Sequence, residues 1–87
     1  GDAHQRGHVV CIRSTGSLLF WMKNTLIPLS AAFIDDTGAI VNIADMQPGT
    51  TDTHCAQKPV RFVLEMNQGW FQKRGFGTGA RIGGLLR

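Results

Sequence analysis

The chain has 87 residues, of which 43 % are hydrophobic and 17 % are charged, and its formal net charge is +3. This length predicts a single domain over residues 1–87, and we expect the polar or glycine-rich ends, 1–7 and 83–87, to be disordered. No apolar run reaches the roughly 18 residues of a membrane span, so we expect no span in this chain. A nucleic-acid-binding surface is normally more basic than a net charge of +3 allows, so we do not expect nucleic acid as a partner.

The first half of the chain reads as a series of strands. Residues 8–13 are rich in β-branched side chains and predict a first strand, which residues 18–23 would join as a hairpin. Pro28 then forms a corner, because a proline ring disfavours the helical region for the residue before it. Residues 31–34 are apolar at every position, which is typical of a central strand buried on both faces.

A turn and a return strand follow. Residues 35–38 read Asp-Asp-Thr-Gly, a strong turn signal, because Asp bonds its own backbone and Gly accepts positive φ. Residues 39–46 predict the return strand, with Val41 and Ile43 on one face and Ile40, Asn42 and Ala44 on the other. Residues 47–58 predict a long loop, and a long loop between ordered strands suggests a binding role.

The last part combines a strand with a short helix. Residues 59–66 alternate, so that Val60, Phe62, Leu64 and Met66 would share one face. Asn67 can cap a helix near residues 68–74, which would end at Gly75 as a left-handed terminator, before a final strand near 81–82. The elements together predict a mainly β fold, a small antiparallel open barrel or two-layer sheet with one short helix.

The stretch from Phe20 to Leu29 contains the side chains that we take as the candidate site. If residues 20–23 are extended, Phe20 and Met22 share one face and Trp21 and Lys23 share the other. In the functional interpretation one groove binds a ligand, with the indole as a stacking platform and a charged recognition pair. Its residues would be Trp21, Lys23, Asn24, Thr25 and Glu65.

A purely structural interpretation of the same residues is also open, and the balance is slightly in its favour. Lys23 would then pair with Glu65 across the sheet, Trp21 would fill the core, and Asn24 and Thr25 would bond the backbone of the corner. A half-exposed ion pair contributes at most about 1 kcal/mol. The residue types alone therefore do not distinguish the two interpretations.

Several motifs occur in the order typical of one known family. Phe-Trp-Met-Lys-Asn-Thr at 20–25, Phe-Ile-Asp at 33–35 with Gly38, and Val-Leu-Glu at 63–65 with Gly69 resemble the domain-of-unknown-function family 192. The resemblance implies a small, mostly bacterial, often exported domain without an assigned activity. It covers about two thirds of the chain.

The chain departs from that family's pattern at three places. The family usually has a Glu-Arg and Gly-Leu-Met segment before the tryptophan motif, and residues 1–19 do not match it, so we expect a truncated or divergent front. Ser30 and Ala80 stand where the family commonly has Asp, which removes two carboxylates. A missing element would uncover a sheet edge, and we therefore expect a homo-oligomer, possibly a homodimer.

Side chains with catalytic or metal-binding potential are few. The acidic residues belong to turns and loops apart from Glu65, which argues against a two-carboxylate hydrolase. The nearest approach to a metal site joins His8, Cys11, His54 and Cys55, but adjacent ligands lack the usual spacing, so we expect neither metal nor cofactor. Trp70 and Phe71, with the lysine and arginine residues near them, could form a platform for single-stranded nucleic acid. Burial of the two aromatic side chains under the short helix explains their presence better.

The two cysteines leave one question open. Cys11 and Cys55 could form a disulfide in an exported protein, or they could be two buried free thiols, and we favour free thiols. We expect a periplasmic or exported protein, with the cytoplasm as the alternative.

We therefore expect a non-catalytic ligand-binding or interaction module whose partner is an unknown small molecule or envelope component. The site would combine the Trp21–Thr25 corner with the 47–58 loop. One alternative is an enzyme that acts on a small or glycan-like substrate with Lys23 and Glu65, and the other is a single-stranded nucleic-acid binder.

Overall fold

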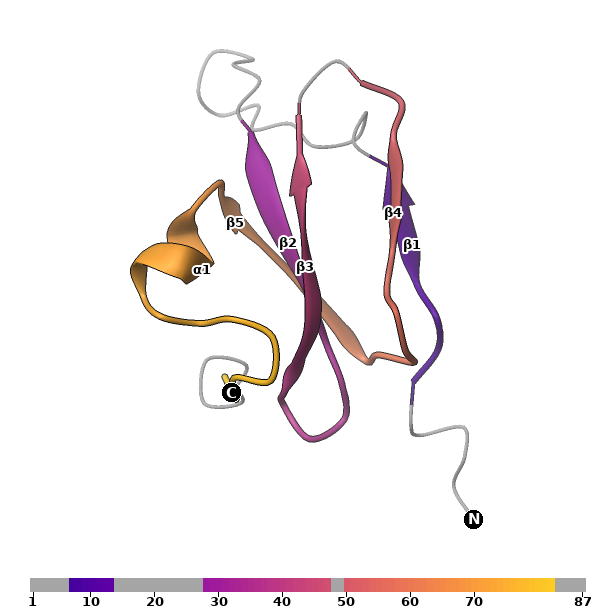
Figure 1. Cartoon of the computed structure of the whole chain (residues 1–87). Helices are drawn as coiled ribbons and strands as arrows, with labels where there is room; N and C mark the ends of the chain where they lie inside the picture. Colours follow the sequence, from indigo (N-terminus) through magenta and orange to yellow (C-terminus); the bar gives the residue numbers. More distant parts are fainter. Residues whose placement is uncertain (1–6, 14–27, 48–49, 83–87) are drawn as a thin grey trace.

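A computed structural model describes residues 7–13, 28–47 and 50–82 of the chain. Its strands form two antiparallel sheets, a three-stranded one in the order β3-β2-β5 and a two-stranded one of β1 and β4 (Figure 1). The elements are β1 (Cys11–Arg13), β2 (Leu29–Ile34), β3 (Ile40–Met46), β4 (Thr53–Cys55), β5 (Phe62–Asn67) and the helix α1 (Trp70–Lys73). The predicted mainly β, two-layer architecture with one short helix is confirmed, and the described strands do not close into a barrel.

Strand β2 is the centre of the fold because each of its six residues is buried. Ala32 and Ile34 pack towards α1, whereas Ala31 and Phe33 pack towards β1 and β4, as the two-residue period of a strand requires. Figure 1 shows the resulting order, with α1 on one side of the larger sheet and the β1–β4 pair on the other. The prediction of a central strand at 31–34 is confirmed.

The α1 side of the larger sheet is covered by the helix and the chain after it. Its buried core consists of Ala32, Ile34, Ile40, Phe71 and Ile82. The segment after α1 is tied to the start of β3, because the N–H of Ile40 donates to the oxygen of Ala80 at 2.8 Å and the N–H of Gly79 donates to the oxygen of Ile40 at 2.8 Å. The predicted final strand near 81–82 is reduced to an isolated bridge between Ala39 and Arg81.

The β1–β4 pair covers the opposite side of the sheet. Phe33, Ala56 and Val60 form its central buried cluster, with Ile12 of β1 packed against them. Asn42 of β3 connects the two layers by hydrogen bonds. Its Nδ2 donates to the oxygen of Cys55 at 3.2 Å, and its Oδ1 accepts from the N–H of Gln57 at 3.1 Å.

The hairpin between β2 and β3 agrees with the sequence at its turn but not along β3. Oδ1 of Asp35 accepts from the N–H and hydroxyl of Thr37, and Gly38 has φ of 86°, as expected. The register then shifts, with Ile34 opposite Ile40 but Phe33 opposite Asn42.

This bulge makes the predicted faces of β3 wrong. An extra residue in one strand reverses the alternation beyond it. Val41 accordingly packs with Phe33 on the β1–β4 side, whereas Ile43 packs with Phe71 on the α1 side. Asn42 and Ala44 also lie on the β1–β4 side, away from Ile40.

The expected loop over 47–58 is wrong in part, because β4 lies inside it. Strand β4 pairs with β1, with Cys11 opposite Cys55 and Arg13 opposite Thr53. The partner predicted for the first strand, residues 18–23, lies outside the described residues. No local pattern in the threonine-rich segment predicts β4. The strand is stabilised by pairing with β1, which lies some forty residues earlier in the chain.

Strand β5 and α1 also differ from the sequence-based prediction at their starts. Val60 packs on the β1–β4 side of the sheet, whereas Leu64 and Met66 pack on the α1 side, so the expected alternation fails before β5 begins. Phe62, the first residue of β5, is 41 % exposed. Asn67 is the last residue of β5 rather than a helix cap. Gly69, with φ of 87° and no side-chain bond, is the residue that precedes α1.

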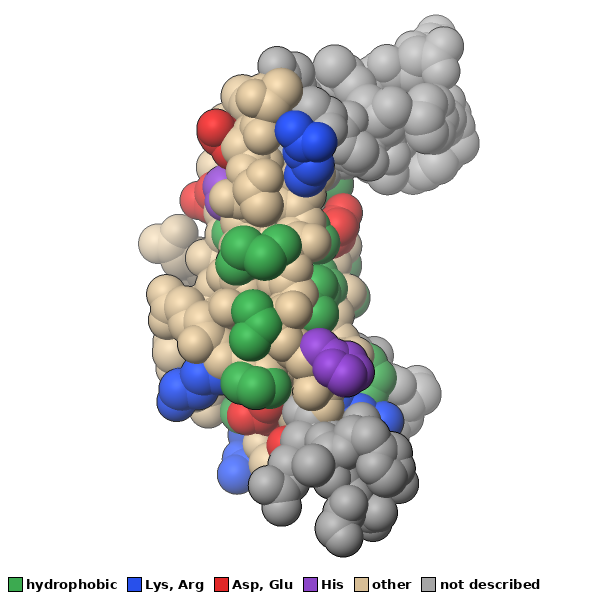
Figure 2. Space-filling view, turned by 90° about the vertical axis from the view of Figure 1, so that its right-hand side faces the viewer, with side chains coloured by type: hydrophobic (Ala, Val, Ile, Leu, Met, Phe, Trp, Pro, Cys, Tyr) green, Lys and Arg blue, Asp and Glu red, His purple; other side chains and the backbone are tan. Residues whose placement is uncertain are grey.

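The two cysteines form a disulfide, which corrects the preference for buried free thiols. Both residues are exposed on the β1–β4 pair, whereas free thiols are usually buried. Figure 2 shows this outer surface, where hydrophobic side chains, which here include cysteine, form a column between charged ones. Val9, which is 61 % exposed, belongs to the same segment of the chain as Cys11.

Candidate functional site

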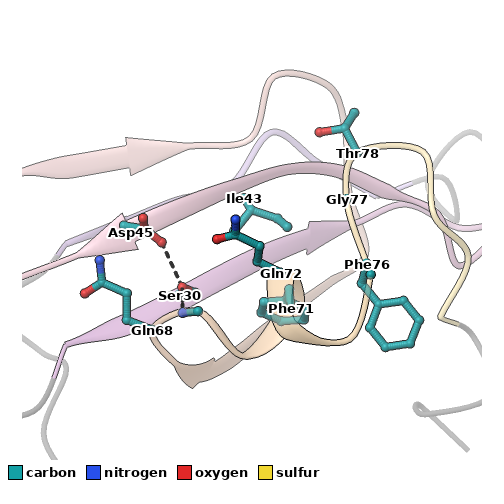
Figure 3. A pocket seen from close by; sticks show the side chains of 11 residues that line it. Ser30, Ile43, Asp45, Gln68, Phe71, Gln72, Phe76, Gly77 and Thr78 are labelled. Carbon is teal, nitrogen blue, oxygen red and sulfur yellow. Dashed lines mark hydrogen bonds between the residues drawn. The ribbon is translucent and has the colours of Figure 1, made fainter.

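The structure contains a pocket between α1 and the sheet, with a volume of about 650 Å³. This volume is within the range of small-molecule sites, which is about 300 to 1,000 Å³. The pocket is lined from two strands, the β5–α1 connection, the helix and the loop after it (Figure 3). Its residues are Ser30, Ile43, Asp45, Gln68, Gly69, Phe71, Gln72, Gly75, Phe76, Gly77 and Thr78.

Ser30 and Asp45 form the polar part of the pocket that belongs to the sheet. They lie opposite each other in the β2–β3 register, and the hydroxyl of Ser30 donates to Oδ1 of Asp45 at 2.8 Å. The same hydroxyl oxygen accepts from the N–H of Gly69 at 3.3 Å. Ser30 is only 2 % exposed, and these two bonds satisfy its side chain and fix the direction of the Asp45 carboxylate.

The helix that forms the second wall is anchored by one aromatic side chain. Phe71 is 2 % exposed and packs in the core on this side of the sheet, with its ring at 79° to that of Trp70. Gln72, the next residue, is exposed and its side chain projects into the pocket beside Asp45 (Figure 3). The last residue of the helix is Lys73, and Gly75, with φ of 76°, is the left-handed terminator that the sequence predicts.

Two glutamines flank the carboxylate at the mouth of the pocket. Figure 3 shows Gln68 on one side of Asp45 and Gln72 on the other. Oε1 of Gln68 accepts from Nε2 of Gln47 at 3.1 Å, which orients that amide. Apolar atoms of Ile43 and Phe71 form the remaining wall. The arrangement places carboxylate and amide groups over an apolar surface, the usual composition of a small-ligand site.

Of the site residues proposed from the sequence, four lie outside the described residues. These are Trp21, Lys23, Asn24 and Thr25. Glu65 is described, and it is exposed on β5 opposite Ala31 of β2. Cross-strand partners share a face, so Glu65 lies on the β1–β4 side of the sheet and outside the pocket.

The residues of the pocket were not found from the sequence. Asp45 reads there as an acid at the end of a strand beside a loop, and the two glutamines carry no motif. The register of β3 decides where Asp45 lies, because the bulge after Phe33 turns Asp45 to the same face of the sheet as Ser30. A bulge in a strand of ordinary composition leaves no local pattern that would predict it.

The other candidates in the sequence have structural roles. Cys11 and Cys55 are used in the disulfide, and the described residues contain no group of three possible metal ligands. Phe71 is core, as expected, and Trp70 is half-buried, with its ring under the guanidinium of Arg74 at 4.1 Å. Figure 3 draws Phe76 with its ring directed away from Asp45.

Comparison with known proteins adds one result. The model of the family DUF192, described as an uncharacterized ACR, matches residues 3–84. The chain belongs to this family. The DUF192 match begins at residue 3 of this chain, whereas the motifs found in the sequence begin at residue 20. Searches of curated proteins and of solved structures found no match.

The geometry bears on one of the family departures. The resemblance led us to expect Asp at the position of Ser30, and the structure places a carboxylate beside this position because Asp45 lies directly across the strand pair. Asp45 therefore places a carboxylate beside the β5–α1 connection. In the described part of the chain, no helix has both the length and the apolar character to cross a membrane.

Proposed function

We propose that this DUF192 domain is a non-catalytic module that binds a small molecule in the pocket between α1 and the three-stranded sheet. The observation that supports the proposal is the convergence of Asp45, Gln68 and Gln72 over the apolar atoms of Ile43 and Phe71. A concave, partly apolar site with a few oriented polar groups is the default description of a ligand site.

Binding accounts for these groups better than catalysis does. Ser30 is buried and its hydroxyl donates to Asp45, so it is a structural link rather than an exposed nucleophile beside a base. The lining residues that the structure describes include one carboxylate, that of Asp45, and no second acid at a set distance from it. Glu65, which the alternative enzyme would use, lies on the other face of the sheet and therefore cannot act in this pocket.

The test is a thermal-shift screen of a small-molecule library with the wild-type chain and two variants. Gln72→Trp fills the pocket, whereas Lys73→Trp places the same bulk on the next residue of α1, which does not line it. Ligand at 100 times its Kd stabilises the folded state by about 2.7 kcal/mol. In a domain of this size we expect the melting temperature to rise by about 10 °C or more.

The comparison of the two variants decides the result. Hits should stabilise the wild type and the Lys73→Trp variant but not the Gln72→Trp variant. Equal stabilisation of both variants would place binding elsewhere and end the proposal. A library without any hit on the wild type would also count against it.

We propose an oxidising compartment, the periplasm or the exterior, for this domain. The Cys11–Cys55 disulfide supports this, because such bonds persist where the surroundings are oxidising and are rare in the cytosol. Alkylation of free thiols in freshly lysed cells, followed by mass spectrometry, tests it. Two alkylated cysteines would contradict the proposal.

A further inference from the structure

We infer that the pocket recognises its ligand through a cationic nitrogen, a primary ammonium or a guanidinium, with an apolar remainder of the molecule against Ile43 and Phe71. The inference rests on the proposed function, since it names the chemistry of the ligand in that same pocket. It follows from the charge, the hydrogen bonding and the shape of the lining.

The charge of the pocket comes from Asp45. It is the one charged side chain among the described residues that line the cavity. Its recorded partner is the hydroxyl of Ser30, which orients the carboxylate but brings no positive charge. No ion pair to Asp45 is found among the described residues. A carboxylate that is oriented and uncompensated is ready to accept a charge-assisted bond from a ligand.

The other polar groups suit a ligand that donates several hydrogen bonds. An ammonium carries three donors and no acceptor, and a guanidinium carries five donors. Beside Asp45, the side-chain amide of Gln72 forms no recorded bond in the described part of the chain and projects into the pocket (Figure 3). Its carbonyl and the two carboxylate oxygens provide acceptors on one side of the cavity.

The aromatic residues argue against a sugar as the main ligand. Sugar sites usually present the open face of a ring for stacking, but Phe71 is 2 % exposed. Phe76 stacks on Trp70 with a centroid distance of 6.1 Å, and the same indole also contacts the ring of Phe71 and the guanidinium of Arg74. The apolar atoms at the pocket therefore provide a wall for an aliphatic chain rather than a platform for a pyranose ring.

An anionic ligand is disfavoured despite the net charge of the chain. The +3 charge belongs to lysine and arginine side chains, and none of these is among the described residues that line the pocket. Lys73 and Arg74 are neighbours of Gln72 and Gly75 in the chain, but they do not line the cavity, and the guanidinium of Arg74 lies over the ring of Trp70. Among the described residues, Asp45 is therefore the charged group that a ligand would contact directly in the cavity.

The test uses three probes with the same aliphatic chain, namely pentylammonium, pentan-1-ol and pentanoate. Binding is followed by chemical-shift changes of the backbone amides of Gly69, Gly77 and Thr78 at low ionic strength. We expect pentylammonium to bind about tenfold or more tightly than the alcohol, because charge-assisted bonds are the stronger ones. Pentanoate should bind more weakly than the alcohol.

Two charge-matched variants complete the experiment. Asp45→Asn keeps an oxygen for the hydroxyl of Ser30 and should reduce the affinity for pentylammonium to that for pentanol. Asp52→Asn removes the same charge at an exposed position outside the pocket and should leave the affinity unchanged. An unchanged affinity in the Asp45→Asn variant would overturn the inference.

The outcomes separate this inference from the function on which it rests. If pentanol and pentylammonium bind equally and both shift the pocket amides, the pocket binds ligands but does not select a cation. If pentylammonium shifts amides elsewhere, or shifts none, the inference is wrong, and the library screen with the two tryptophan variants decides the function separately.

Discussion

Cys11 and Cys55 lie directly opposite each other in the β1–β4 pair and are joined by a disulfide, although 44 positions separate them in the sequence. The bond connects the two short strands that cover one side of the larger sheet. Each of these strands has three residues, so the pair has few hydrogen bonds of its own. The covalent link is therefore a main constraint on that layer.

Removal of the disulfide should destabilise the domain strongly. For a loop of this length the chain-entropy model gives about 4 kcal/mol, a large part of the stability of a small domain. The free energy of unfolding in urea, measured with and without a reductant, checks this. A Cys11→Ser/Cys55→Ser variant should show the same loss and no further response to the reductant. An unchanged urea midpoint after complete reduction would contradict the prediction.

Asn42 should matter more than its partial exposure suggests. Its amide bonds the oxygen of Cys55 and the N–H of Gln57, so Asn42→Ala removes two bonds between β3 and the end of β4. We expect a loss of about 1 to 2 kcal/mol, measured by urea unfolding. Asn67→Ala, an exposed position at the end of β5, is the control and should change the stability by less than about 0.5 kcal/mol. Similar losses in both variants would refute the role of Asn42.

Asp35 should make the stability depend on pH in the acid range. Burial raises the pKa of this carboxyl, but hydrogen bonds from Thr37 and Ala39 and the charge of Arg81 outweigh it, and the pKa lies below its usual value of 3.8. A pKa that is lower in the folded than in the unfolded state stabilises the fold above the unfolded value, and this contribution is lost as the pH falls through the folded value.

The corresponding experiment compares Asp35→Ala with the wild type at two pH values. Near pH 7 the variant should be less stable by about 1 to 2 kcal/mol, because the turn loses its hydrogen bonds. The difference should shrink as the pH falls below about 4, where the wild type loses the contribution of the charge. Asp36→Ala, in the same turn, is the control. A difference that grows as the pH falls would show that the sign is wrong.

The Ser30–Asp45 bond should show energetic coupling. Ser30→Ala leaves the N–H of Gly69 without this acceptor and removes the donor to Asp45, and we expect a loss of about 1 to 2 kcal/mol. A double-mutant cycle with Asp45→Ala should give a coupling energy of about 0.5 kcal/mol or more. Thr78→Ala at the edge of the pocket should be nearly neutral. Additive effects of the two substitutions would contradict the bond.

A buried and an exposed phenylalanine, Phe71 and Phe62, give a test of the layer order. Phe71→Ala empties a fully buried position between α1 and the sheet and should cost about 3 to 5 kcal/mol. Phe62 is 41 % exposed, and Phe62→Ala should cost about 1 kcal/mol or less. Equal losses, measured by urea unfolding, would mean that α1 does not cover the sheet as described.

The elements with strong local signals could be predicted from the sequence. Apolar residues at 31–34 identified the central strand, Asp35 and Gly38 identified the turn, and Gly75 identified the end of the helix. In each case the cause is local, since burial on both faces, a side chain that bonds its own backbone and a positive φ select particular residue types. The family motifs are also a property of the sequence, and the match over residues 3–84 confirms them.

The pocket and the second layer were decided by tertiary contacts alone. Strand β4 exists because Thr53–Cys55 pairs with β1, and Asp45 reaches Ser30 because a bulge shifts the register of β3. The disulfide follows from the same pairing. A strand register depends on which distant residues meet, and a shift of one position moves every side chain beyond it to the other face, which no local pattern in the sequence records.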